Sequence, residues 1–193
     1  MNDLPPEGAQ SDEDIARAHV TTPALHNATI QLDDPDPAWP ARYERTAAAI
    51  RAALGDTVLL LEHVGSTSVP GLPAKPILDL LLIVADPADE AAYVPPLESI
   101  GYVLTIREPD WFEHRVLKLH EGEMPVNLHV LPDDCPETRR MLGFRDWLRE
   151  HDDDRDLYAR TKRDLARRTW KYVQNYADAK SEVVEAIIAR AGL

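Results

Sequence analysis

The sequence predicts a mixed α/β (α+β) fold, in which a mixed β-sheet is flanked by helices and followed by a C-terminal helical segment. The chain has 193 residues, enough for one well-buried core in a single domain. Its patterns run helix, strand, strand, helix, strand, a pair of strands and then helices only. That order lacks the regular alternation of a parallel βαβ sheet, so it favours a mixed sheet with helices on one face and at one end.

The stretch up to about residue 25 is predicted to be a disordered leader, and residues 26–193 a single domain. The leader is polar, acidic and contains proline, with little that could be buried. A short extended piece follows around residues 28–32. The domain then divides into a core over about 40–131 and a helical tail over about 136–191.

The first core elements are a helix and two strands. Residues 40–54 carry apolar side chains at helical spacing, with Pro40 suited to the first turn and Gly55 to the C-terminal cap. Residues 58–64 and 77–84 are runs rich in Val, Ile and Leu, which is typical of buried strands. The turn region between them is rich in Gly, Pro and Ser, which indicates a shaped loop.

The remaining elements are shorter. A helix that begins at Asp86-Pro87 is expected to be bent or broken at Pro95-Pro96 and to end before Gly101. The other predicted elements are a strand over 102–106, a hairpin of strands over 115–119 and 126–131, and tail helices over 136–150, 155–170 and 178–190.

Composition narrows the class of protein. The formal net charge is -13, which argues against bulk nucleic acid or an anionic membrane as a partner and favours a small-molecule ligand. The single cysteine, Cys135, excludes an internal disulfide, and there is no Cys/His cluster for structural zinc. No signal peptide or membrane-spanning run is visible. We therefore expect a cytoplasmic protein.

Two features of the segment Glu62–Ile83 point to chemistry. Gly65-Ser66 follows a strand, where a tight glycine turn can aim backbone N–H groups and a hydroxyl at a phosphate. Asp79 is a lone carboxylate on an otherwise apolar strand, and leaving it buried and unpaired would cost several kcal/mol. Either a divalent cation balances it or Lys75 or a nearby arginine does.

Two polar side chains on a later strand could join Asp79. Asn127 and His129 are two residues apart, so both leave the same face of their strand. With Asp79 they could form a mixed pocket in which His129 is a metal ligand or a general base. A satisfied structural histidine is the alternative.

Several segments resemble the GrpB family, which is placed in the polymerase-β-like nucleotidyltransferase superfamily and is sometimes fused to dephospho-CoA kinase. The resemblance runs from about residue 30 to the end. It is carried by EHVGSTSVPGLPAKPILDL (62–80), DPDPAWPARYER (34–45), NLHV (127–130), FRDWLR (144–149), YARTKRDLA (158–166) and the segment Tyr176–Lys180.

The resemblance implies a nucleotidyltransferase-like core with a triphosphate on the loop and Mg²⁺ or Mn²⁺ on a strand carboxylate. It implies a catalytic, metal-binding role for Asp79. The neighbouring strand offers Asn127 and His129 where a third acid would be sought, so these two are the further candidate metal ligands, with His129 also the candidate catalytic base. The residues expected to hold the nucleotide or its phosphates are Gly65, Ser66, Thr67, Ser68, Lys75, Arg145, Lys162 and Lys180. One departure stands out: Leu81 occupies the position of the second strand acid that holds two metals in active members of the superfamily.

Two functions follow from these expectations. The first is a metal-dependent nucleotidyltransferase that joins a nucleotide to an unknown small-molecule acceptor. The alternative is a catalytically reduced nucleotide-binding or regulatory module, linked to coenzyme A metabolism by the family's fusions. Leu81 favours the second, while the retained Ser66, Asp79 and His129 favour the first.

Overall fold

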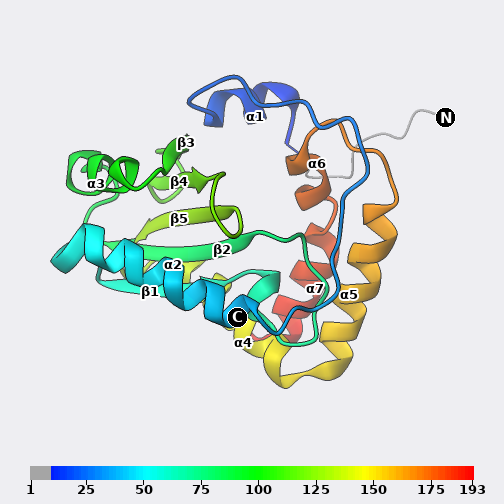
Figure 1. The fold of residues 1–193 in the computed structure, drawn as a ribbon. Helices are drawn as coiled ribbons and strands as arrows, with labels where there is room; N and C mark the ends of the chain where they lie inside the picture. The colour runs from blue at the N-terminus through cyan, green and yellow to red at the C-terminus, as the bar shows by residue number, and fades with distance from the viewer. Residues whose placement is uncertain (1–9) are drawn as a thin grey trace.

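A five-stranded mixed sheet with the strand order β1-β2-β5-β4-β3 is the centre of the structure, a computed structural model that describes residues 10–193 (Figure 1). β2 and β5 run parallel, and every other neighbouring pair is antiparallel. The predicted mixed α/β class is therefore confirmed. The strands are β1 (Leu60–Val64), β2 (Leu78–Val84), β3 (Val103–Glu108), β4 (His114–Leu119) and β5 (Val126–Pro132).

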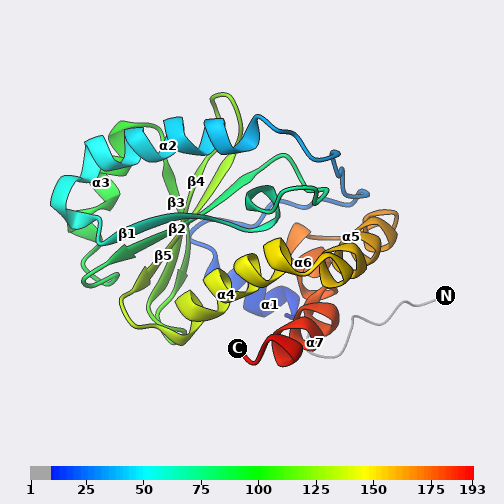
Figure 2. The ribbon, with the colours of Figure 1, turned by 90° about the horizontal axis from the view of Figure 1, so that it is seen from below.

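One face of the sheet packs on α2 (Trp39–Leu54) and α3 (Val94–Ser99) (Figure 2). Ile50, Leu80 and Leu128 are fully buried in the core between these layers. α3 is shorter than the helix predicted from Asp86. Its two prolines lie in the first turn, where a missing N–H costs nothing, so they begin the helix instead of bending it.

The other face is covered in part by the tail, whose helices are α4 (Pro136–Glu150), α5 (Asp152–Ala166), α6 (Val173–Asp178) and α7 (Ser181–Ala191). α4 begins and ends as predicted, and its Met141 and Leu142 pack on Leu81 and Leu131 of the sheet. The other two predicted tail helices are corrected in their bounds: the first is α5, which begins at Asp152 and ends at Ala166, and the last is α7, which begins at Ser181. The short helix α6 was not predicted. Figure 2 shows α2 and α3 on one side of the sheet and α4 on the other.

The N-terminal segment differs from the predicted leader. Residues 1–9 lie outside the described part of the chain, but α1 (Asp12–Ala18) is a helix with a capping box, in which the Ser11 hydroxyl accepts a hydrogen bond from the Asp14 amide at 3.1 Å. Ile15 on this helix is only 1% exposed. The Val20 amide donates to the Thr105 carbonyl of β3 at 2.9 Å. A single buried apolar side chain and a cap thus hold an otherwise acidic stretch against the sheet.

Candidate functional site

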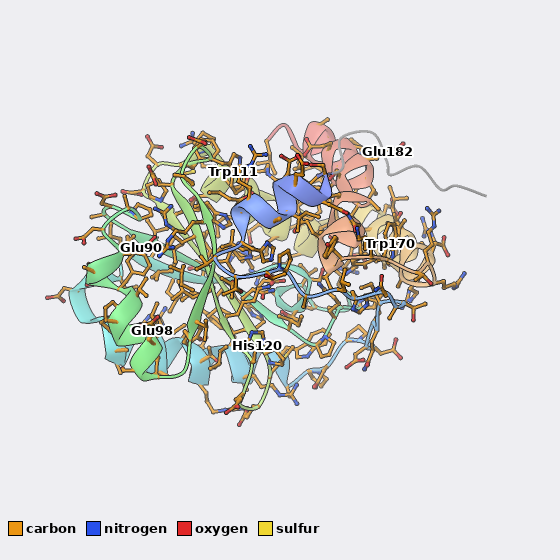
Figure 3. All side chains as sticks on the ribbon, turned by 90° about the horizontal axis from the view of Figure 1, so that it is seen from above. Glu90, Glu98, Trp111, His120, Trp170 and Glu182 are labelled. Atoms are coloured by element: carbon orange, nitrogen blue, oxygen red, sulfur yellow. The ribbon has the colours of Figure 1, made fainter. Side chains whose placement is uncertain are left out.

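A cavity of about 430 Å³ lies where the sheet, the tail and the N-terminal segment meet. The loop after β1, the strands β2, β5 and β4, and the helices α5 and α6 all contribute to its lining. Ile15 and His19 of the N-terminal segment line it as well. Viewed from above, α1 lies across the space between the sheet and the C-terminal helices (Figure 3). The cavity is therefore built from segments that are far apart in the sequence.

Gly65 sets the shape of the loop that enters the cavity. Its backbone angles, φ 66° and ψ -171°, belong to a region that essentially only glycine occupies. A Cβ at this position would lie 2.5 Å from Oδ2 of Asp79 and 2.8 Å from its Cβ. The loop backbone can therefore approach the carboxylate only because residue 65 has no side chain.

Ser66 lies next to a buried amine. The Lys162 Nζ is 2.8 Å from the Ser66 Oγ and also bonds the Pro73 carbonyl, while it sits 4.7 Å from the centre of the Tyr158 ring. Lys162 is 1% exposed, and burial lowers its pKa to about 6, with Lys180 adding to the effect. Tyr158 and Lys162 are four residues apart and thus share one face of α5.

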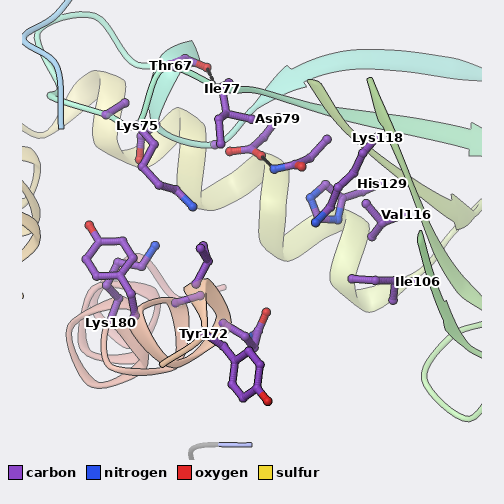
Figure 4. A pocket seen from close by; sticks show the side chains of 18 of the residues that line it. Thr67, Lys75, Ile77, Asp79, Ile106, Val116, Lys118, His129, Tyr172 and Lys180 are labelled. Atoms are coloured by element: carbon purple, nitrogen blue, oxygen red, sulfur yellow. Dashed lines mark hydrogen bonds between the residues drawn. The ribbon is translucent and has the colours of Figure 1, made fainter. Parts of the chain in front are cut away.

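Lysine is concentrated here. The chain has five lysines, and four of them line this cavity: Lys75, Lys118, Lys162 and Lys180. The ammonium groups of Lys75 and Lys180 lie 5.9 and 4.8 Å from the centre of the Tyr176 ring. Figure 4 shows Lys75 extending from the loop toward Lys180 on the tail. Burial is the largest influence on the pKa values of Lys75, Lys118 and Lys180, and it lowers all three.

Asp79 is the carboxylate of the cavity lining, and its neighbour is an amide. The Asn127 Nδ2 donates to the Asp79 Oδ1 at 2.8 Å (Figure 4). Asp79 pairs with Asn127 across β2 and β5, and Asn127 pairs with Lys118 across β5 and β4, so the three side chains form one row on the sheet. The next row along holds Leu81, His129 and Val116.

Leu81 occupies the position where the family resemblance implies a second metal-binding acid. It is fully buried with Val64, Ile83, Leu131 and Cys135, under α4. A carboxylate there would be buried among these apolar side chains, so its burial would be costly. The apolar contact with α4 closes this part of the sheet face.

His129 reaches the cavity and is tied to a second histidine. Its Nδ1 lies 3.0 Å from the His114 Nε2, and the two rings stack with centroids 5.3 Å apart. Burial lowers the pKa of His129, and the neighbouring His114 lowers it further. His129 is accordingly a neutral imidazole at neutral pH.

The donors suit one divalent cation and not two. Over residues 10–193 there is no group of three His, Cys, Asp or Glu side chains placed to hold a metal. The Nδ1 of His129 is occupied by His114, and Asn127 turns its NH₂ group to Asp79. Asp79 remains as a single carboxylate, which fits a Mg²⁺ ion that takes its other ligands from phosphates and water.

The structure brings most of the predicted residues together. Gly65, Ser66, Thr67, Lys75, Asp79, Asn127, His129, Lys162 and Lys180 all line the cavity. Arg145 and Ser68 do not. The Arg145 guanidinium bonds the Glu62 carboxylate at 2.8 Å and the His63 carbonyl at 3.0 Å, which anchors α4 to β1. The Ser68 hydroxyl donates to the Gly65 carbonyl at 2.6 Å and so closes the turn.

Two residues were missed at the sequence level. Lys118 lies on β4 beside Asn127, and His114 lies behind His129. The composition held a signal for Lys118. The chain has 16 arginines and only five lysines, and the two residue types are not interchangeable, so each lysine was a candidate for a specific role. Nothing in the spacing of His114 distinguished it.

The mixed sheet, the glycine-serine loop and the lysine-lined cavity define an α/β protein with a polar site between sheet and tail. The chain belongs to the GrpB family: the family profile described as "GrpB protein" matches residues 29–190. Over 191 residues it is 53% identical to the UPF0157 protein BH1888 of Halalkalibacterium halodurans, covering 99% of this chain and 97% of that protein.

Two further relatives extend the comparison. A crystal structure of the conserved protein GrpB from Enterococcus faecalis matches with a TM-score of 0.74 and 31% identity, over 83% of this chain and 96% of that chain. A protein of Mycolicibacterium paratuberculosis described as dephospho-CoA kinase is 28% identical over 186 residues, which are 84% of this chain and 46% of that protein. α1 lies outside the part matched by the family profile. Within the described residues, every helix is too short or too polar to cross a bilayer.

Proposed function

We propose that the cavity binds the triphosphate of a nucleotide and that the protein transfers the nucleotidyl group to a small molecule. The observation that carries the proposal is the gathering of four of five lysines around one carboxylate, in a chain whose net charge is -13. With every lysine protonated, the lining holds four positive charges and one negative charge from Asp79, a net +3. A ligand with several negative charges is the natural complement of such a lining.

Without a ligand, burying the charged ammonium groups of the four lysines costs free energy. Burial is the largest cause that lowers the pKa values of all four lysines, which means that their charged forms are poorly solvated in the cavity. A polyphosphate would supply the missing counter-charge, because its oxygens accept charge-assisted hydrogen bonds from ammonium groups. The open backbone at Gly65 and the Ser66 hydroxyl lie on the same side and would contact the same phosphates.

Each residue has a separate task in this proposal. Lys75, Lys162 and Lys180 hold the phosphates, and Ser66 orients them. Asp79 would hold a Mg²⁺ or Mn²⁺ ion, which would supply positive charge to neutralise the transferred group. His129 accepts the proton of the attacking hydroxyl.

The alternative function is a nucleotide-binding module without transfer. It is favoured by Leu81, which fills the place of a second metal-binding acid with apolar contacts. A role beside coenzyme A metabolism would suit the relative described as dephospho-CoA kinase. Such a module would bind nucleotide through the same lysines and show no turnover with any acceptor.

Calorimetric titration with each nucleoside triphosphate, with and without Mg²⁺, tests the proposal. We expect binding to wild type and a loss of about 10- to 100-fold in affinity for Lys180→Met and for Lys75→Met, because each removes a charged hydrogen bond worth about 1.5–3 kcal/mol. Lys171→Met is the matched control, since Lys171 lies outside the cavity lining and contacts Asp12. Absence of nucleotide binding under every metal condition would refute the proposal, and binding without turnover would favour the module.

A further inference from the structure

A row of three side chains leads from the surface of the sheet to the cavity. The Glu108 Oε2 lies 2.7 Å from the His114 Nδ1, and the His114 Nε2 lies 3.0 Å from the His129 Nδ1. Glu108 and His114 are direct partners across β3 and β4, and His129 is on the adjacent strand β5. The strands themselves therefore hold the three groups in line.

The middle group of this row is shielded from water. His114 is 5% exposed, stacks on the His129 ring, and is covered edge-on by Trp111 at a centroid distance of 5.0 Å. A buried imidazole in this position satisfies its two nitrogens through its two protein neighbours. Each hydrogen bond in the row must then have a definite direction.

The direction follows from which groups can donate. An ionised carboxylate only accepts, so the His114 Nδ1 carries the hydrogen that Glu108 receives. When His114 is neutral it has one N–H, which leaves its Nε2 as an acceptor. The His129 Nδ1 must then be the donor of the second bond. By the same count, the His129 Nε2 carries a lone pair and no hydrogen.

We infer that Glu108 and His114 are positioning residues that fix His129 as its Nδ1–H tautomer, with Nε2 as the free basic nitrogen. His129 lines the main cavity and also a second cavity of about 600 Å³, which Glu108, Trp111 and His114 line as well. In Figure 4 the His129 ring lies between Asp79 and Val116. The charged groups that act on His129 are Asp79, Lys118 and Glu108.

The role in catalysis rests on the proposed function. The hydroxyl of the acceptor gives its proton to the His129 Nε2, so that an O–H bond breaks and an N–H bond forms. The resulting oxygen attacks the α-phosphorus of the nucleotide, and pyrophosphate leaves with the electron pair of the broken P–O bond. The imidazolium that forms on His129 is stabilised by Glu108 through His114.

Nitrogen-detected NMR of ¹⁵N-histidine-labelled protein tests the tautomer without any nucleotide. At about pH 8, above the ordinary pKa of imidazole, we expect the His129 Nδ1 to be protonated and its Nε2 to be unprotonated. A spectrum of His129→Gln identifies the His129 signals among those of seven histidines. A wild-type spectrum with hydrogen on the His129 Nε2 would overturn the inference.

Two matched variants test the part played by Glu108. Glu108→Ala removes the acceptor of the first bond, so we expect the His129 Nε2 signal to shift from its unprotonated toward its protonated position. Glu113→Ala changes the charge by the same amount in the loop after β3, but Glu113 bonds Arg115 and neither histidine, so we expect no shift. An unchanged spectrum for Glu108→Ala would show that Glu108 does not set the tautomer. Because no nucleotide is present, the result is independent of whether the protein binds one.

Discussion

Replacing Gly65 by alanine should damage both the stability and the site, and the structure gives the size of the effect. The backbone of Gly65 has angles that cost a residue with a side chain about 1–3 kcal/mol. Its new Cβ would lie 2.5 Å from the Asp79 Oδ2 and 2.8 Å from the Asp79 Cβ, and such overpacking costs about 1–3 kcal/mol more. We expect Gly65→Ala to lose roughly 2–6 kcal/mol in all.

The variant Gly55→Ala separates the cost of backbone strain from the cost of overpacking against Asp79. Gly55 also has a positive φ, 53°, but a Cβ there would have no neighbour within 4 Å, so only the backbone strain applies. Urea denaturation followed by tryptophan fluorescence should place Gly65→Ala about 1–3 kcal/mol below Gly55→Ala. Only Gly65→Ala should also weaken nucleotide binding, since it displaces the Asp79 carboxylate. Equal losses of stability in the two variants, with unchanged binding in both, would refute the close approach of the loop to Asp79.

Three further predictions concern the cavity and the helix α1, whose Ile15 lines it. Lys162 has a pKa of about 6 and is mostly neutral near pH 7 without ligand, so phosphates that raise this pKa will make binding take up a proton. The affinity should then fall as pH rises above neutral, and the binding enthalpy should vary with the ionisation enthalpy of the buffer for wild type but much less for Lys162→Met. Asp79→Asn removes the negative charge of the lining, so we expect nucleotide to bind roughly tenfold more tightly without Mg²⁺. The nucleotide affinity of this variant should no longer depend on the metal, as measured by titration with and without EDTA. Ile15→Ala removes the buried side chain that anchors α1, and such a truncation typically costs about 2–5 kcal/mol. We therefore expect amide hydrogen exchange of residues 12–18 to become fast while the amides of β2 stay protected. A uniform loss of protection would contradict this local opening.

The sheet could be predicted from the sequence because its strands carry their own pattern. The runs that became β1 and β2 are apolar, are separated by a loop rich in glycine and proline, and match the prediction to within two residues. The spacing of Asn127 and His129 placed both on one face, and the pairing of β5 with β2 brings Asn127 to Asp79. The alternation of side chains between the two faces of a strand is a local property, so it can be recognised in a single sequence.

The tail residues of the site could not be found from spacing alone. Lys162 and Lys180 were expected through the family resemblance, and their approach to Ser66 and Lys75 depends on how the tail packs against the sheet. Arg145 matched a family segment in the same way, but its side chain turns to Glu62. Matching a position therefore did not determine the direction of its side chain.

The helix α1 was missed although its signal was present. Ser11 and Asp14 form the pattern of a capping box, which favours a helix start. The acidic composition around them outweighed this local signal. Ile15 is buried against the rest of the chain, and bonds from Val20 to Thr105 and from Gln10 to Asp178 hold the segment on either side of the helix.

Ile15 of α1 lines the cavity, yet the residues that flank this helix bond parts of the chain that come much later in the sequence. The Val20 amide bonds the Thr105 carbonyl of β3, and the Gln10 amide bonds the Asp178 carboxylate, 168 residues later. Contacts between residues so distant in sequence form only after the intervening chain has folded. We therefore expect the sheet to fold before α1 is placed, so that the cavity is still open in the partly folded protein.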